Sequence, residues 1–148
     1  MTITDNEIPN GFKFFTGLCI FIGTVGLLVN GIFLLLSFAP ALPPKMKEVA
    51  PGFLLSTLHI ALDIGYIIGA KKCKEHQRWA PRLLIIFAAT SLLELIYNTI
   101  TSLYKAEITI TPVSLSYLVI PLILEGSIIY YFTQRSVMAY VSGDSQPK

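Results

Sequence analysis

Apolar residues fill four long stretches of the chain, at residues 14–38, 50–70, 81–103 and 113–133. Each stretch holds about 20 residues or more, and a helix of that length crosses the ~30 Å hydrocarbon core of a bilayer. Prolines and polar residues separate one stretch from the next. The pattern therefore predicts an all-α fold, an integral membrane four-helix bundle, with one membrane domain over residues 14–133.

The segments outside this domain are short. We expect residues 1–13 to be a cytoplasmic N-terminal segment and residues 134–148 a cytoplasmic tail, in which 136–141 can form a short interfacial helix. The connections between the stretches lie near residues 39–50, 71–80 and 104–112. Segments of this length cannot fold alone, because they bury too little surface. Any activity is therefore expected between the helices, at the two membrane interfaces or with a partner.

Charged residues make up 14% of the chain, against about 25% in soluble domains, which disfavours a soluble fold. With an even number of spans, both termini and the second connection lie on one side. That side holds eight basic residues, namely Lys13, Lys71, Lys72, Lys74, Arg78, Arg82, Arg135 and Lys148. The other side holds three, namely Lys45, Lys47 and Lys105. Because positive residues collect in the cytoplasm, both termini are predicted to be inside (N-in/C-in).

The second connection combines basic residues with a tryptophan. The members of this interfacial group are Lys71, Lys72, Lys74, Arg78, Trp79 and Arg82. Such a group sets the topology of a membrane protein and contacts anionic headgroups, while a nucleic-acid patch is the alternative interpretation. We favour the membrane interface, and expect membrane lipid rather than nucleic acid as its partner.

Motifs that carry chemistry are sparse. Cys19 lies in the first stretch and Cys73 in the basic connection, without a CxxC, so neither a disulfide nor a structural metal site is expected. Cys73 and His76 have a C-x-x-H spacing, but no second ligand pair accompanies them. The chain has no glycine-rich phosphate loop, no H-E-x-x-H and no G-x-S-x-G motif. The sequence therefore predicts neither a metal nor a cofactor.

Small and polar residues recur on one face of the first stretch, at Thr16, Cys19, Gly23, Gly26 and Asn30. Steps of three and four residues place them on one side of a helix. The second stretch ends with Gly65 and Gly69, a GxxxG pair. Small residues let helix backbones approach closely, which is the main way that membrane helices associate. We expect both faces to be helix contacts, within the bundle or in a homodimer.

A second polar set lies inside the predicted spans, at His59, Asp63, Glu94, Asn98 and Glu125. Charged side chains are costly in lipid and usually turn toward the interior of a bundle. His59 with Asp63, and Glu94 with Asn98, are separated by four residues, so each pair shares a helix face. We therefore expect one inward polar cluster. Because His59 is its only basic candidate, at least one of the acids should be protonated.

Three functions fit this cluster. In the first, the acids hydrogen-bond across helices and fix the packing. In the second, they conduct protons or bind a cation or a cationic substrate. In the third, His59, Asp63 and Glu94 form an acid–base site for a lipid or sterol-like molecule. We favour the first, a non-catalytic membrane protein that acts as an accessory subunit or small oligomer and packs against itself or a membrane-protein partner.

Three segments carry a family resemblance, namely Gly65-Tyr66-Ile67-Ile68-Gly69, Arg78-Trp79-Ala80-Pro81-Arg82 and Tyr131-Phe132-Thr133-Gln134-Arg135-Ser136-Val137. Through these three segments, the last three apolar stretches resemble small bacterial four-helix inner-membrane proteins. Those proteins have a glycine-rich end of the second helix, a basic W-A-R-like turn and an end like Y-F-x-R-P-E-V. The chain departs from the pattern at Pro81, which separates Ala80 from Arg82, and at Ser136 and Met138. The resemblance implies a four-helix topology and a location in the bacterial inner membrane, and it implies no function.

Overall fold

The structure is a computed structural model that describes residues 8–38, 53–104 and 112–143. Within these ranges the chain is helical and contains no strand, so the predicted all-α class is confirmed. The helices are α1 (Phe12–Ser37), α3 (Phe53–Lys74), α4 (Ala80–Tyr104), α5 (Pro112–Thr133) and α6 (Arg135–Ser142). The predicted segment 1–13, the tail 134–148 and the connections 39–50 and 104–112 lie wholly or partly outside the described residues.

Glycine and proline set several of the helix ends. Gly11 precedes α1 with a φ of 85°, and Gly143 follows α6 with a φ of 71°, a left-handed conformation that glycine adopts without strain. Pro112 begins α5, and Pro81 lies in the first turn of α4, where a missing N–H costs little. Pro121 lies inside α5, where it removes one helical hydrogen bond.

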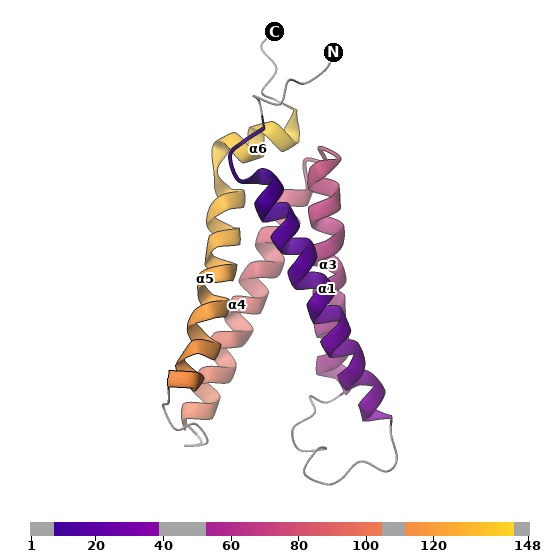
Figure 1. The fold of residues 1–148 in the computed structure, drawn as a ribbon, viewed down its shortest axis with the longest axis vertical. Helices are drawn as coiled ribbons and strands as arrows, with labels where there is room; N and C mark the ends of the chain where they lie inside the picture. Colours follow the sequence, from indigo (N-terminus) through magenta and orange to yellow (C-terminus); the bar gives the residue numbers. More distant parts are fainter. Residues whose placement is uncertain (1–7, 39–52, 105–111, 144–148) are drawn as a thin grey trace.

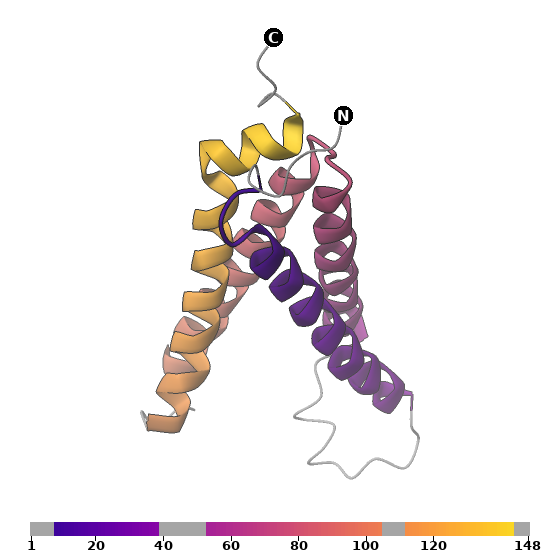
Figure 2. The same cartoon turned by 45° about the horizontal axis from the view of Figure 1, so that its top comes forward.

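The four longer helices form two antiparallel pairs, α1 with α3 and α4 with α5 (Figure 1). The pairs meet at one end of the molecule and diverge toward the other end, as Figure 2 also shows. The short helix expected at 136–141 is present as α6, and it lies across the end at which the pairs meet (Figure 1). α1 and α4 begin at this end, and α3 and α5 finish at it, as an up-down arrangement of four helices requires.

The buried core lies at the end that carries α6. It includes Leu84, Ile128, Phe132, Val137 and Val141, all of which are fully buried. The two valines are four residues apart on α6 and so share the face that covers the core. The α6 end therefore joins the two helix pairs through a common core.

Large apolar side chains also face outward along the helices. Leu28 is 64% exposed, Leu93 67% and Ile123 60%. α1 and α4 contain segments, Phe12–Leu36 and Ala80–Thr101, that are long and apolar enough to cross a membrane. Among the described residues of α5, Leu118–Thr133 form a shorter apolar segment. These observations support association with a membrane.

Candidate functional site

α1 and α3 pack closely because glycines face the partner helix. Gly23 of α1 lies so near to α3 that a Cβ atom there would be 2.5 Å from the carbonyl oxygen of Asp63. A Cβ atom on Gly26 would overlap the Asp63 carboxyl group. Further along α1, Asn30 donates a hydrogen bond from Nδ2 to Oδ2 of Asp63 over 2.8 Å. The small-residue face of α1 therefore seats the Asp63 side chain and gives it a hydrogen-bond donor.

Glycines also let α4 pack closely on another side of α3. A Cβ atom on Gly65 would overlap the ring of Phe87, and one on Gly69 would lie 2.7 Å from Leu84. The residues that the sequence suggested for helix packing thus contact helices of the same chain. No homodimer seam is needed to cover either glycine face.

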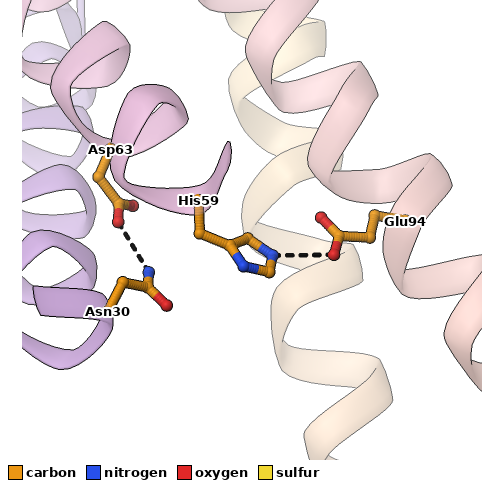
Figure 3. A network of polar contacts seen from close by, with 4 residues as sticks. All are labelled: Asn30, His59, Asp63 and Glu94. Carbon is orange, nitrogen blue, oxygen red and sulfur yellow. Dashed lines mark hydrogen bonds and ion pairs between the residues drawn. The ribbon is translucent and has the colours of Figure 1, made fainter. Parts of the chain in front are cut away.

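The side chains of His59 and Asp63 point in different directions from α3 (Figure 3). Asp63 points to Asn30 on α1, whereas His59 points to α4, where its Nε2 atom lies 2.8 Å from Oε1 of Glu94. The His59 side chain is 29% exposed and that of Glu94 19%, so their contact is partly accessible. It is an ion pair when the imidazole carries both protons. The single inward cluster expected from the sequence is therefore divided between two sides of α3.

Glu125 also has its partner on α3. The hydroxyl of Tyr66 donates a hydrogen bond to Oε2 of Glu125 over 2.5 Å. The ring of Tyr66 also lies beside that of Phe87 on α4, at a centroid distance of 6.2 Å. Tyr66 and Glu125 are 2% and 8% exposed, so this contact lies in the interior. Tyr66 thereby links α3, α4 and α5 at one point.

A cavity of about 250 Å³ lies between α3, α4 and α5. Its polar lining comes from His59, Ser91, Glu94, Asn98 and Glu125. A cavity of this size and polarity has room for several water molecules or a small cation. Four of the five members of the predicted polar cluster therefore share one cavity, and Asp63 lies apart from it, against α1.

The cavity brings together an imidazole, two carboxyl groups, an amide and a hydroxyl. Among the described residues, Nδ1 of His59 is buried without a hydrogen-bond partner, and the contact of Oε1 of Glu94 with Nε2 of His59 is an ion-pair distance without hydrogen-bond geometry. A buried polar atom of this kind usually has a partner, such as an ordered water. Groups of these types can hold the helices together, pass a proton or hold a cation. Within the described ranges, no group of three or more His, Cys, Asp or Glu residues is placed to hold a metal ion.

Sequence reasoning did not single out Tyr66 or Ser91 as members of the site. Tyr66 follows Asp63 by three residues and His59 by seven, and Ser91 precedes Glu94 by three. These spacings place each hydroxyl on the same side of its helix as the charged residue. Extending the helical period from the charged residues would have found both. A hydroxyl in an apolar stretch is far less conspicuous than a charge, so it was passed over.

The basic interfacial group lies at the end of the molecule that carries α6. Its exposed members are Lys71, Lys74, Arg78, Trp79 and Arg82, while Lys72 is half-buried. Arg78 donates a hydrogen bond from Nε to the carbonyl oxygen of Ser142 over 3.1 Å. Nδ1 of His76 lies 3.2 Å from the carbonyl oxygen of Tyr140. These contacts hold the connection against α6.

Searches of protein-family models, of curated proteins and of solved structures find no match to this chain. The function proposed below therefore rests on the residues and geometry of the chain and on the resemblance seen in its sequence.

Proposed function

We propose that this chain is a non-catalytic integral membrane protein of four helices, with both termini inside, in the bacterial inner membrane. Its outward apolar side chains and the apolar segments of α1 and α4 support insertion into a bilayer. The orientation is supported by the exposed basic residues Lys71, Lys74 and Arg82, which lie at the end with α6. The resemblance of the last three helices to small bacterial inner-membrane proteins supports the location.

The observation that carries the non-catalytic proposal is the pairing of the interior acids. Each acid of the predicted cluster contacts a polar side chain of a neighbouring helix, in the pairs Asn30–Asp63, His59–Glu94 and Tyr66–Glu125. The three pairs join α3 to α1, α4 and α5 in turn. Hydrogen bonds between membrane helices contribute about 1 kcal/mol each, whereas an unpaired polar group in lipid costs more. The polar interior therefore serves to position the helices around α3.

In this proposal the protein acts as an accessory subunit or a small oligomer. α3, α4 and α5 expose Leu58, Ile100 and Leu115 in the part of the molecule where the helix pairs diverge. A membrane-protein partner or a second copy can pack there as well as lipid. We expect native mass spectrometry from mild detergent to report more than one copy or a co-purifying subunit. A chain that is monomeric and alone under all mild conditions would contradict the accessory role.

Replacing Glu94 with glutamine distinguishes a packing role of this residue from a role in transport. Glutamine keeps an oxygen acceptor near Nε2 of His59 and removes the carboxyl charge. If the pair serves packing, we expect Glu94→Gln to change the free energy of unfolding in detergent by less than about 1 kcal/mol. We also expect that neither the native protein nor the Glu94→Gln variant supports a pH-dependent flux in liposomes. Glu75→Gln, at an exposed acid outside the cavity, is the matched control.

A proton- or cation-coupled transport element is the second candidate, and the cavity favours it. His59, Glu94 and Glu125 line one space of about 250 Å³, and the His59–Glu94 contact is partly accessible. Ionisable groups inside a membrane frequently mark such pathways. Transport predicts a flux that Glu94→Gln abolishes while the protein stays folded. The transport proposal fails if the native protein shows no flux and Glu125→Gln changes only thermal stability.

A further inference from the structure

A second and larger cavity lies at the end of the molecule that carries α6. It has a volume of about 570 Å³ and lies between α6 and the start of α4. Its lining includes Arg78, Trp79, Arg82, Arg135, Met138 and Ser142. None of these residues lines the polar cavity between α3, α4 and α5. The two cavities are therefore separate sites.

α6 forms one wall of this cavity because it is amphipathic. Val137 and Val141 are fully buried against the core, while Met138 and Ser142, the next residue in each case, line the cavity. The connection before α4 is tied to this wall, since Arg78 donates a hydrogen bond to the carbonyl oxygen of Ser142. Core packing and this hydrogen bond thus hold the walls in place without any ligand.

Three arginines from three different parts of the chain line the cavity. Arg78 belongs to the connection, Arg82 to the first turn of α4, and Arg135 is the first residue of α6. Among the residues that the structure describes, no acidic side chain lines the cavity. Like charges that line one cavity repel one another, so an anion placed among them is favoured. A guanidinium group presents its donors as a planar fork that matches phosphate oxygens.

The surroundings of the cavity favour a ligand at the membrane surface. Trp79 lies in its wall and is 46% exposed. Tryptophan is enriched at the level of lipid headgroups because its ring is apolar and its N–H is polar. The end with α6 is also the end predicted to face the cytoplasm, where anionic lipids attract basic residues.

We propose that this cavity binds a phosphate group, carried either by the headgroup of an anionic phospholipid or by a soluble phosphate ester. Both ligands offer the arginines the same charged oxygens. The lipid source rests on the membrane placement proposed above. The binding of phosphate itself rests only on the cavity and its arginines.

Trp79 is a built-in reporter for this site because it is the single tryptophan of the chain. The full chain is reconstituted in phosphatidylcholine vesicles that contain a small fraction of phosphatidylglycerol with brominated acyl chains, which quench tryptophan fluorescence. A matched vesicle contains brominated phosphatidylcholine instead. We expect phosphatidylglycerol to quench Trp79 more strongly, and to saturate at a low fraction of the lipid.

Two double variants test whether the arginines cause this preference. Arg82→Gln with Arg135→Gln removes two charges from the cavity, and Lys71→Gln with Lys74→Gln removes two exposed charges from the same end. We expect the first to weaken the apparent affinity for phosphatidylglycerol about tenfold or more, since charge-assisted hydrogen bonds are lost. The second should weaken it less than about threefold. The double variant Arg82→Lys with Arg135→Lys keeps both charges but removes the planar guanidinium donors. It is used in place of the glutamine variant if that variant does not fold.

Glycerol phosphate added to the detergent-solubilised protein separates the two sources. A shift of Trp79 emission that the Arg82 and Arg135 variant loses identifies a soluble ester as a ligand. A preference for phosphatidylglycerol without that shift identifies the lipid headgroup. Equal quenching by the two brominated lipids with no response to the ester, or equal losses in the two double variants, would overturn the proposal. A chain that stays soluble without detergent yet responds to the ester would refute the membrane placement and leave the phosphate site standing.

Discussion

Replacing Gly23 with alanine should lower the free energy of unfolding by about 2 kcal/mol or more, because an overpacked contact must be relieved by backbone movement. The new Cβ atom would lie 2.5 Å from the carbonyl oxygen of Asp63. That oxygen belongs to the backbone of α3, so no side-chain rotation removes the overlap. α1 and α3 must move apart, and the hydrogen bond between Asn30 and Asp63 is then weakened or lost.

A denaturant titration in detergent micelles, followed by circular dichroism, measures this loss. Gly17→Ala and Gly31→Ala are matched controls on the same helix, because a Cβ atom at either position meets no atom within 4 Å. Both controls should be neutral or stabilised by up to about 1 kcal/mol, since alanine favours the helix over glycine. If Gly23→Ala is as stable as Gly17→Ala, α1 does not pack on α3 as described.

Gly26 allows the cause of the destabilisation to be checked. The nearest atoms to a Cβ there belong to the Asp63 side chain, whereas at Gly23 the nearest atom is in the backbone. Adding Asp63→Ala should therefore restore part of the stability that Gly26→Ala loses. The same addition should not rescue Gly23→Ala. Rescue of both variants by Asp63→Ala would show that both glycines contact only the side chain of Asp63 and not its backbone.

Replacing Tyr66 with phenylalanine should lower the free energy of unfolding by about 1–3 kcal/mol. The ring is retained, including its contact with Phe87 at a centroid distance of 6.2 Å. Glu125, however, loses its hydrogen-bond donor. Glu125 is only 8% exposed, so a replacement partner can come only from a water molecule in the cavity that it lines. A buried polar group without a partner costs more than the hydrogen bond contributed.

The same titration tests the role of Tyr66. Tyr130→Phe is the control, since Tyr130 is 71% exposed and should change stability by less than about 0.5 kcal/mol. Tyr66→Phe combined with Glu125→Leu removes both polar groups and should recover much of the loss. A double-mutant cycle then gives the interaction energy of the pair. Strictly additive losses would show that Tyr66 and Glu125 do not stabilise each other.

The helices were predictable because their ends depend on local features of the chain. The four apolar stretches match α1, α3, α4 and α5 with ends displaced by only a few residues. Pro81 and Pro112 lie at helix starts, where their missing N–H is tolerated. The glycine faces were predictable for a similar reason, since a step of three or four residues assigns a side of a helix without any knowledge of its neighbours.

The partners of the polar residues were not predictable in this way. His59 and Asp63 share one side of α3, but at ~100° per residue they differ by about 40° around its axis. α1 packs on α3 at Asp63, and α4 packs on it near His59, so this small offset sends the two side chains to different helices. Tyr66 escaped notice because its importance comes from the position of Glu125, 59 residues away along the chain.

The order of residues along this chain by itself determined its helical class, the extent of its apolar segments, its basic end and the sides of α1 and α3 that carry glycine. All of these are properties of neighbouring residues, and helical periodicity converts them directly into lengths and faces. Only the tertiary structure decided which acid meets which donor, that α6 folds across the bundle, and that Arg135 and Arg82 line one cavity. Such distances between remote residues depend on how closely glycines let the helices approach and on how the core seats α6, and neither is encoded in the spacing of any single segment.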